Sequence, residues 1–546
     1  MPLPDSEKSS LSAPNGVPSQ CHSNPGPCNS LAAHFDSLAR HFRSISATTT
    51  TEPVAQHTAH LTRLLSEAEG YLDSIAPIRK LPVEILCKIF AEACVLDRNA
   101  ADERASLARA DLLRLSRVCS RWHDIVMDSP HLWSTIQIKG DLWPKDPDLA
   151  APFLRLLELA LERTASHPLY LSLSISTYSP VTVEAALHRV VKHCGRWKTV
   201  ELRIDEAHLD ALASIKGHLP MLEYLVLYYY GSDKVEIFSV APKLTVVDLM
   251  HDRDADDPHP SLPWRQLHSF TYDCICAYSL APALTAMGNI SYPGASFTIS
   301  ALNVVLHFWD QCINELRPMT STISALHLEF CDASGTIRGD PREAGGLVGP
   351  ILANLTLPQL EEFSLSSYGS LEDSVFWPSA AFESLGWRSS FRNTLRILEL
   401  PAVSVTLDQL VQCLSSLASL ERLLIADQHE SEHYTSDWSR REKRDNTIMT
   451  DELFMRLAWT PDVSCLIPRL KSFTCLTFLR FGDEAFLDFV ASRIPHGRST
   501  IGPFNVHLRP LVSSTRTVPQ QSIDRLSEWV GRDELRFCLS DTVKQG

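Results

Sequence analysis

Residues 77–94 read PIRKLPVEILCKIFAEAC, and this stretch decides how the N-terminal part of the chain folds. Pro82 suits the first position of a helix, where its missing N–H costs nothing. Glu84 places a negative charge in the first turn, where it favours the helix dipole. The apolar residues fall at helical spacing: Leu81, Ile85, Leu86, Ile89, Phe90 and Ala93. The pattern predicts an amphipathic helix that begins at Pro82.

A second apolar stripe follows a polar, alanine-rich stretch, residues 97–110. Its members line one helical face: Leu112, Leu115, Val118, Cys119, Trp122, Ile125 and Val126. The sequence 128–130, Asp-Ser-Pro, stops this helix, because the residue before a proline disfavours the helical conformation. Leu132, Trp133 and Ile136 resume the apolar pattern. These stripes predict a small all-helical module, which is marginal alone and often completes its core with a partner.

Three blocks of this module carry a resemblance to a known family. They are Leu81-Pro82-x-Glu84-Ile85-Leu86-x-x-Ile89-Phe90, Leu115-Ser116-x-Val118-Cys119-x-x-Trp122 and Pro130-x-Leu132-Trp133. Together they resemble an F-box domain over residues 77–138. The likeness is greatest to the F-box proteins abundant in mushroom-forming fungi, which also carry a leading helix that ends in Pro-Ile-Arg. The polar spacer between Cys94 and Asp111 is longer than in compact F-boxes.

The resemblance implies a binding subunit. F-box proteins dock onto the Skp-type adaptor of a cullin–RING ubiquitin ligase, and their C-terminal domain captures the protein to be ubiquitinated. Catalysis belongs to other subunits, so we expect no catalytic residue, cofactor or metal in this chain. The alternative is an F-box scaffold protein that acts outside the ligase. The residues expected to form the adaptor interface and its supporting core are Leu81, Pro82, Ile85, Leu86, Ile89, Phe90, Val118, Cys119, Trp122 and Trp133.

The chain divides by sequence into four parts. Residues 1–30 are rich in Ser, Pro, Asn and Gly, and we predict that they are disordered because they cannot bury enough apolar surface. Residues 31–76 carry two short helical patterns and form a helical leader. Residues 77–138 are the F-box domain, and residues 139–546 are a domain that binds the target or another partner.

A recurring L-x-x-L-x-L pattern predicts strands in the last part. It begins at Trp197, Leu222, Leu244, Leu267, Ile323, Leu360, Leu395, Leu420 and Leu470. Helical patterns lie between strands, at residues 183–194, 301–316 and 407–417. Several intervals fall within the leucine-rich period of about 20–29 residues, and the longer ones indicate insertions or missed repeats.

A strand and a helix in each unit, stacked in order, predict a degenerate leucine-rich-repeat-like α/β solenoid after the helical F-box, a mixed α+β or α/β fold. A pair of ordinary α/β domains is the rival architecture.

Side chains alternate along a strand, so positions between the leucines should point outward. The outward set comprises Glu201, Tyr224, Val226, Tyr228, Asp248, His327, Glu329, Glu362, Glu399 and Arg422. The target-binding residues predicted from this set are Tyr224, Val226, Tyr228, Glu362 and Glu399. Its acidic members favour a partner with a basic segment.

Charge and hydropathy exclude several classes. The 50 Lys and Arg residues against 65 Asp and Glu residues give a net charge of −15. This charge disfavours a nucleic-acid-binding protein, because such a protein needs a surplus of basic residues to neutralise phosphates. The start of the sequence lacks a secretory signal, and no apolar run approaches the ~20 residues that span a bilayer. We therefore expect a protein of the cytoplasm, the nucleus or both, with no membrane partner.

Residues 429–433, His-Glu-Ser-Glu-His, match the H-E-x-x-H zinc motif. That spacing places two histidines on one helical face, with the glutamate as a general base. Here the motif is followed by polar and charged residues up to Arg444 rather than by an apolar helix. We predict a solvated loop in which His429, Glu430 and His433 bind no metal, and a zinc hydrolase is the least favoured alternative.

Overall fold

The computed structural model describes most of the chain, and every structural statement below concerns those residues. They are residues 62–63, 66, 77–95, 110–138, 143–144, 147–175, 180–230, 235–251, 260–273, 280–303, 316–332, 348–369, 375–401, 403–427, 447–460, 465–494, 503–511, 514 and 516–540. The chain divides into two compact units, Met1–Ile89 and Phe90–Gly546, which we describe separately.

The first unit contains the short 3-10 helix η1 (Pro77–Lys80) and the first turns of α3 (Val83–Val95), which continues across the unit boundary. The helix begins at Val83, one residue later than predicted, and Pro82 precedes it. The backbone N–H groups of Ile85 and Leu86 both donate to the carbonyl oxygen of Pro82 at 3.1 Å. The predicted helices of the leader, residues 31–76, lie outside the described residues, apart from three helical positions at 62–63 and 66.

The second unit opens with short helices after the end of α3. They are α4 (Ala110–Leu115), α5 (Ser120–Met127) and α6 (Pro130–Trp133). The sequence predicted one continuous helix over the first two, and this was wrong. Arg117 and Val118 donate to the carbonyl groups three residues back, at 3.1 Å each, so the chain turns there. The Ser116 hydroxyl bonds to the Leu113 carbonyl at 2.9 Å, a local bond that competes with helix continuation.

Large aromatic residues fill the core of this helical part. The rings of Phe90 and Trp122 lie 4.7 Å apart. The indole N–H of Trp133, which is buried, donates to the carbonyl oxygen of Val126 at 2.8 Å. The buried indole therefore keeps a hydrogen-bond partner while its ring contributes apolar area.

A 14-stranded sheet forms the rest of the second unit, and its strands follow one another in sequence order. They are β1 (Thr135–Ile138), β2 (Leu169–Ser174), β3 (Trp197–Asp205), β4 (Tyr224–Tyr230), β5 (Val246–His251), β6 (Ser269–Asp273), β7 (Ser296–Asn303), β9 (Ala325–Asp332), β11 (Glu362–Gly369), β12 (Ile397–Leu400), β13 (Arg422–Ala426), β14 (Ser472–Thr477), β15 (Phe504–Pro510) and β16 (Leu535–Leu539). Each described pairing in it is parallel. The short strands β8 (Met319–Thr320) and β10 (Leu355–Thr356) pair separately.

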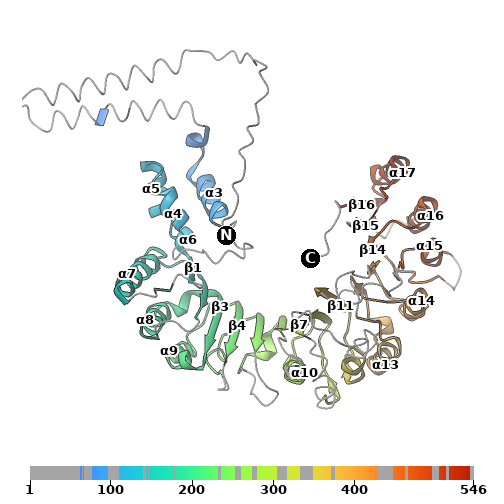
Figure 1. The fold of residues 1–546 in the computed structure, drawn as a ribbon, viewed down its shortest axis with the longest axis horizontal. Helices are drawn as coiled ribbons and strands as arrows, with labels where there is room; N and C mark the ends of the chain where they lie inside the picture. The colour runs from blue at the N-terminus through green and yellow to red at the C-terminus, as the bar shows by residue number, and fades with distance from the viewer. Residues whose placement is uncertain are drawn as a thin grey trace, which may run out of the picture. The chain divides into compact units, whose positions relative to one another are not determined.

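Helices connect many of the strands and pack along one face of the sheet (Figure 1). They are α7 (Pro147–Arg163), α8 (Pro180–Val191), α9 (Leu209–Leu212), α10 (Leu280–Asn289), α13 (Ser379–Ser389), α14 (Leu407–Ser415), α15 (Asp451–Leu457), α16 (Asp483–Arg493) and α17 (Gln520–Gly531). Parallel neighbours require such crossovers, because a tight hairpin can join only antiparallel strands.

The apolar positions of the strands line up on the helix-covered face. One in-register row crosses the sheet and is buried along its length: Leu171, Val200, Leu225, Val247, Phe270, Phe297, Leu326, Phe363, Leu398, Leu423, Phe473 and Val506. At roughly 25 cal/mol per Å² of apolar surface, this burial is the main stabilising contribution to the sheet. The side chains between these positions point to the other face.

The predicted strands exist, but most begin two residues later than predicted. In β5, β11 and β13, for example, the first leucine of the pattern precedes the strand in a tight turn. Leu244, Leu360 and Leu420 are fully buried there, and each donates its N–H to the carbonyl three residues back. The sequence missed β1, β2, β7, β15 and β16, which lack the full pattern.

The predicted helices fared unevenly. Those at 183–194 and 407–417 correspond to α8 and α14. The helix predicted at 301–316 was wrong at its start, because residues 301–303 belong to β7, while residues 304–315 lie outside the described part. The apolar residues of that stretch suit a strand as well as a helix, so periodicity alone misassigned them.

Asp427, immediately after β13, is a buried carboxylate that joins segments distant in the sequence. It accepts backbone N–H bonds from Ile448 at 2.9 Å, Met449 at 2.8 Å and Phe478 at 3.0 Å. The hydroxyl of Thr477 donates a fourth bond at 2.7 Å. Burial raises the pKa of Asp427, and these four donors oppose that shift by stabilising the charged form.

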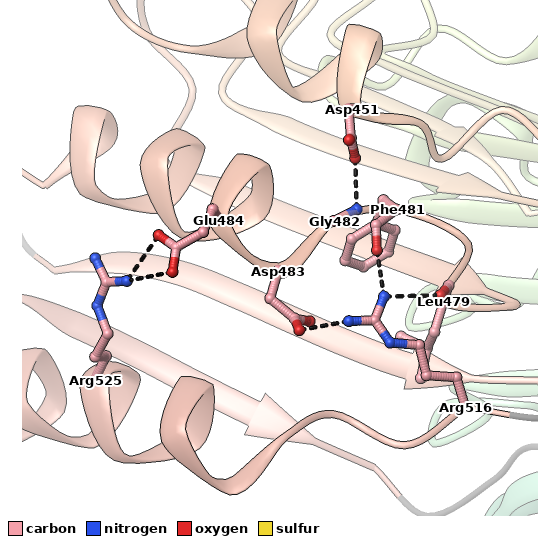
Figure 2. Close-up of polar contacts among 8 residues, drawn as sticks. All are labelled: Asp451, Leu479, Phe481, Gly482, Asp483, Glu484, Arg516 and Arg525. Carbon is pink, nitrogen blue, oxygen red and sulfur yellow. Dashed lines mark hydrogen bonds and ion pairs between the residues drawn. The ribbon is translucent and has the colours of Figure 1, made fainter.

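Polar contacts also tie the last two helices to their neighbours (Figure 2). Arg516, ahead of α17, forms an ion pair with Asp483 in the first turn of α16 and donates to the carbonyl oxygen of Phe481. Arg525 of α17 contacts Glu484 of α16 at 2.9 Å. These charged side chains pair with one another and with backbone groups. The contacts therefore hold α17 and the segment before it against α16.

Replacing Asp427 with Asn should destabilise the second unit by about 3 kcal/mol, because an amide nitrogen would face N–H and O–H donors in a buried site. Chemical denaturation followed by circular dichroism measures the change. Asp488→Asn, at an exposed position on α16, is the matched control and should change stability by less than about 0.5 kcal/mol. Equal denaturation midpoints for the two variants would contradict the anchoring role.

Candidate protein-binding surfaces

The residues predicted for adaptor binding separate into exposed and buried sets. In the first unit, Pro82, Ile85 and Ile89 are exposed, with Ile85 41% and Ile89 40% accessible. In the second unit, Val118 is 60% accessible. Leu86, Phe90 and Trp133 are buried, and the half-buried members are Leu81, Cys119 and Trp122.

This division assigns different roles to the two sets. Leu86, Phe90 and Trp133 are core residues, since almost none of their surface is accessible. The exposed apolar residues of α3 also include Val83, at 45%. Several exposed branched apolar residues within two helical turns favour a surface that a partner covers, whereas a single one would need no explanation.

The second surface is the face of the large sheet opposite the described helices, which we call the open face (Figure 1). Its middle row crosses the sheet in register: Ser172, Glu201, Val226, Asp248, Thr271, Thr298, His327, Ser364, Glu399, Leu424, Thr474 and His507. Every outward position that the sequence predicted lies in this row or two residues from it along a strand. The pleat therefore places all five residues predicted to bind a target on one face, with five strand spacings between the three on β4 and Glu362 on β11.

Charge on the open face is distributed unevenly. Between β3 and β12 the carboxylates are Glu201, Asp205, Asp248, Asp273, Glu329, Glu362 and Glu399. Among the described open-face residues of those strands, only Arg203 and His327 can carry positive charge. From β13 to β16 the sign reverses, and the charged residues are Arg422, Arg509 and Arg536.

Short polar contacts join neighbouring strands within the acidic part. The Tyr224 hydroxyl donates to the carboxylate of Asp248, from β4 to β5. The Ser172 hydroxyl donates to Glu201 at 2.5 Å, from β2 to β3. These contacts fix two of the carboxylates in place without neutralising them.

A cation–π pair and an ion pair complete the contacts. The guanidinium of Arg203 lies 4.6 Å from the centre of the Tyr228 ring. The His327 ring and the Glu362 carboxylate approach to 3.8 Å, from β9 to β11. Tyr228 therefore already provides an aromatic platform for a cation on this face.

The carboxylates near the centre of the face are hard to ionise. Burial raises the pKa of Asp273 to about 6; the nearby charges of Glu329 and Asp248 raise it further, and a hydrogen bond with Ser300 opposes the shift. Burial also raises the pKa of Glu329, which His327 opposes. The Oδ1 atom of Asp273 is buried and has no hydrogen-bond partner among the described residues. Partial burial thus opposes the ionisation of both carboxyl groups, and the neighbouring negative charges oppose that of Asp273 as well.

Sequence reasoning missed Asp273 and Arg203. A usable signal was present for both. The stretch Ser269-Phe270-Thr271-Tyr272-Asp273 alternates apolar and polar residues and puts Asp273 on the same face as Thr271. Arg203 lies two residues after Glu201, so the same alternation puts these two residues on one face. Their proximity to other charges could not be read from the sequence, since it depends on the register between β5, β6 and β9.

No metal site is assigned among the described residues, where no group of three or more His, Cys, Asp or Glu side chains could hold an ion. The H-E-x-x-H motif at 429–433 lies outside them, so its prediction stays untested. No described helix is long and apolar enough to cross a bilayer.

Comparison with known proteins bears on the first surface. The F-box-like family model matches residues 78–139, which nearly coincides with the predicted domain at 77–138. The match supports an F-box protein that binds an adaptor. A search of curated proteins finds no match to this chain.

Asp273→Asn should stabilise the protein at neutral pH. In the folded protein the pKa of Asp273 is about 6, above the value near 3.9 expected in the unfolded chain. The aspartate therefore lowers the free energy of unfolding increasingly as the pH rises from about 4 to about 6. We expect the variant to gain about 1 kcal/mol at pH 7.5 and progressively less toward pH 4.5, because solvent screening reduces the effect of a half-buried group.

Denaturation midpoints measured across this pH range test the expectation. Asp488→Asn again serves as the control, and the gain for Asp273→Asn is measured relative to it at each pH. A gain for Asp273→Asn that is constant with pH, or that reverses at neutral pH, would contradict the burial argument.

Proposed function

We propose that the chain is the substrate-recognition subunit of an SCF-type cullin–RING ubiquitin ligase. In this role residues 77–138 dock the Skp-type adaptor, and residues 139–546 hold the target protein. The observation that carries the proposal is the F-box-like match at 78–139, together with the exposed apolar residues Val83, Ile85 and Ile89 of α3. A partner that covers these side chains removes their apolar surface from water, which favours association.

The large sheet region is, on this proposal, a degenerate leucine-rich-repeat-like solenoid. Its support is the parallel pairing of strands in sequence order, with helices packed along one face. Such an array offers a long continuous face to a partner, since every added strand extends the same surface. The open face, with Tyr224, Val226, Tyr228, Glu362 and Glu399, is the proposed target-binding surface.

The chain itself performs no catalysis on this proposal, and the cullin-bound subunits transfer ubiquitin. The cullin is reached only through the adaptor. The protein would then act in the cytoplasm, the nucleus or both, where these ligases work. The F-box scaffold function remains the alternative, and it differs by binding the adaptor without entering a cullin complex.

The double variant Ile85→Ala/Ile89→Ala should weaken adaptor binding at least about 10-fold. Each truncation removes exposed apolar surface that the adaptor would cover, and about 1.4 kcal/mol corresponds to a tenfold change in affinity. The measurement is titration of the full chain with a purified Skp-type adaptor by isothermal calorimetry. Both side chains are already about 40% accessible, so the fold should tolerate the change.

Val240→Ala/Val530→Ala is the matched control, because it truncates two exposed valines of the second unit. It should bind the adaptor as the unchanged protein does. Equal affinities for the Ile85/Ile89 variant and this control would contradict adaptor docking through α3. A cullin pull-down from cells then separates the ligase from the scaffold: adaptor without cullin would favour the scaffold.

A further inference from the structure

The acidic part of the open face carries more negative charge than its surroundings balance. Asp248, Asp273 and Glu329 lie on β5, β6 and β9, close enough for the first and last to raise the pKa of Asp273. Their side chains are half-buried, so the attraction of water for the charged forms is reduced. A fold under no other constraint would gain stability by making Asp273 and Glu329 neutral, since burial raises the pKa of both.

The same part of the face has features that suit a cation. Tyr228 holds the guanidinium of Arg203 against its ring at 4.6 Å, so an arginine can stack at this depth. Half-buried carboxylates beside aromatic rings attract guanidinium and ammonium groups more strongly than exposed carboxylates do, because the lower local dielectric weakens screening. The Oδ1 atom of Asp273 has no hydrogen-bond partner among the described residues, and because this atom is buried, a bound cation would act on the carboxylate mainly through its charge.

We propose that the open face between β3 and β12 binds an extended segment that bears lysine or arginine side chains, with Asp248, Asp273 and Glu329 as the central acceptors. That the segment belongs to a ubiquitination target rests on the proposed function. The binding of a cationic segment does not, because it is argued from the charge of this face and from the contact between Arg203 and Tyr228.

Charge complementarity selects this occupant over an acidic or phosphorylated one. An anionic segment would meet seven like-charged side chains between β3 and β12, as named above, and would raise the cost of ionising Asp273 further. The arginines of β13 to β16, Arg422, Arg509 and Arg536, lie on the other part of the face. Bound anions would therefore be expected there and not over β5 to β9.

The width of the proposed binding surface determines the length of the test peptide. Neighbouring strands lie about 4.8 Å apart, so crossing from β3 to β12 takes about 34 Å, and an extended peptide of about ten residues spans it. The probes are fluorescein-labelled peptides of this length with alternating Arg-Ser, Gln-Ser or Glu-Ser sequence. Fluorescence anisotropy with the full chain measures the affinity of each peptide.

The test variant is Asp248→Asn/Asp273→Asn/Glu329→Gln, and the control is Glu162→Gln/Glu452→Gln/Glu528→Gln, which removes the same charge from exposed helix positions. We expect the Arg-Ser peptide to bind the unchanged protein and the control alike. The test variant should bind it at least about 10-fold more weakly while its thermal midpoint rises or stays equal, since relieving partial burial costs no stability. Raising salt from about 0.05 to about 0.3 M should also weaken binding.

Three results would overturn the proposal: no binding of the Arg-Ser peptide, binding of the Gln-Ser or Glu-Ser peptide at least as tight, or equal affinity of the test variant and the control. Adaptor titration of the same preparations keeps the two proposals distinct. If adaptor binding persists while the peptide test fails, the receptor role stands and the target chemistry is wrong. If the peptide binds while the adaptor does not, the open face does bind a cationic segment and the ligase role is wrong.

Discussion

The in-register parallel pairing of the strands is the constraint on which the rest of the second unit depends. Because Leu202, Leu227 and Leu249 face one another in neighbouring strands, the buried residues two positions before them, Val200, Leu225 and Val247, also fall on the helix-covered side. A shift of one residue in any pairing would move that strand's polar residues into the core and its leucines into water. The same pairing necessarily gathers the residues between the leucines on the open face. Burial of the core and assembly of the acidic surface are thus two results of one register.

The buried carboxylates of the second unit differ in whether hydrogen bonds compensate their burial. Asp427 receives four hydrogen bonds and joins distant segments, so its burial is compensated. Asp273 is also partly buried, yet one of its oxygen atoms has no partner among the described residues, and the charges of Glu329 and Asp248 raise its pKa. Groups that oppose folding in this way are common at functional sites, where a ligand supplies the missing partner. This contrast is the physical reason for placing a binding site on the open face.

Much of this could be predicted from sequence, and the failures have definite physical causes. Leu-x-x-Leu-x-Leu spacing predicted nine strands of the large sheet, β3 to β6, β9 and β11 to β14, and the outward position of Glu362, because alternation is a property of a single strand. Leu360 was misplaced onto the strand because a buried turn residue and a buried strand residue look alike in sequence. The break at Val118 was missed, since the apolar stripe continues through it. The acidic cluster around Asp273 depends on which strands are neighbours, and this information lies in long-range pairing.

We propose two separate protein-binding surfaces on this chain, an apolar one on α3 and an acidic one on the open face. Hydrogen–deuterium exchange of the full chain, measured alone, with a Skp-type adaptor and with the Arg-Ser peptide, tests whether the two surfaces are separate. We expect the adaptor to slow exchange in Val83–Val95 and to leave β5 to β9 unchanged, and the peptide to do the reverse. Protection of both regions by either ligand alone, or protection of neither region by the adaptor, would contradict the proposal of two separate surfaces.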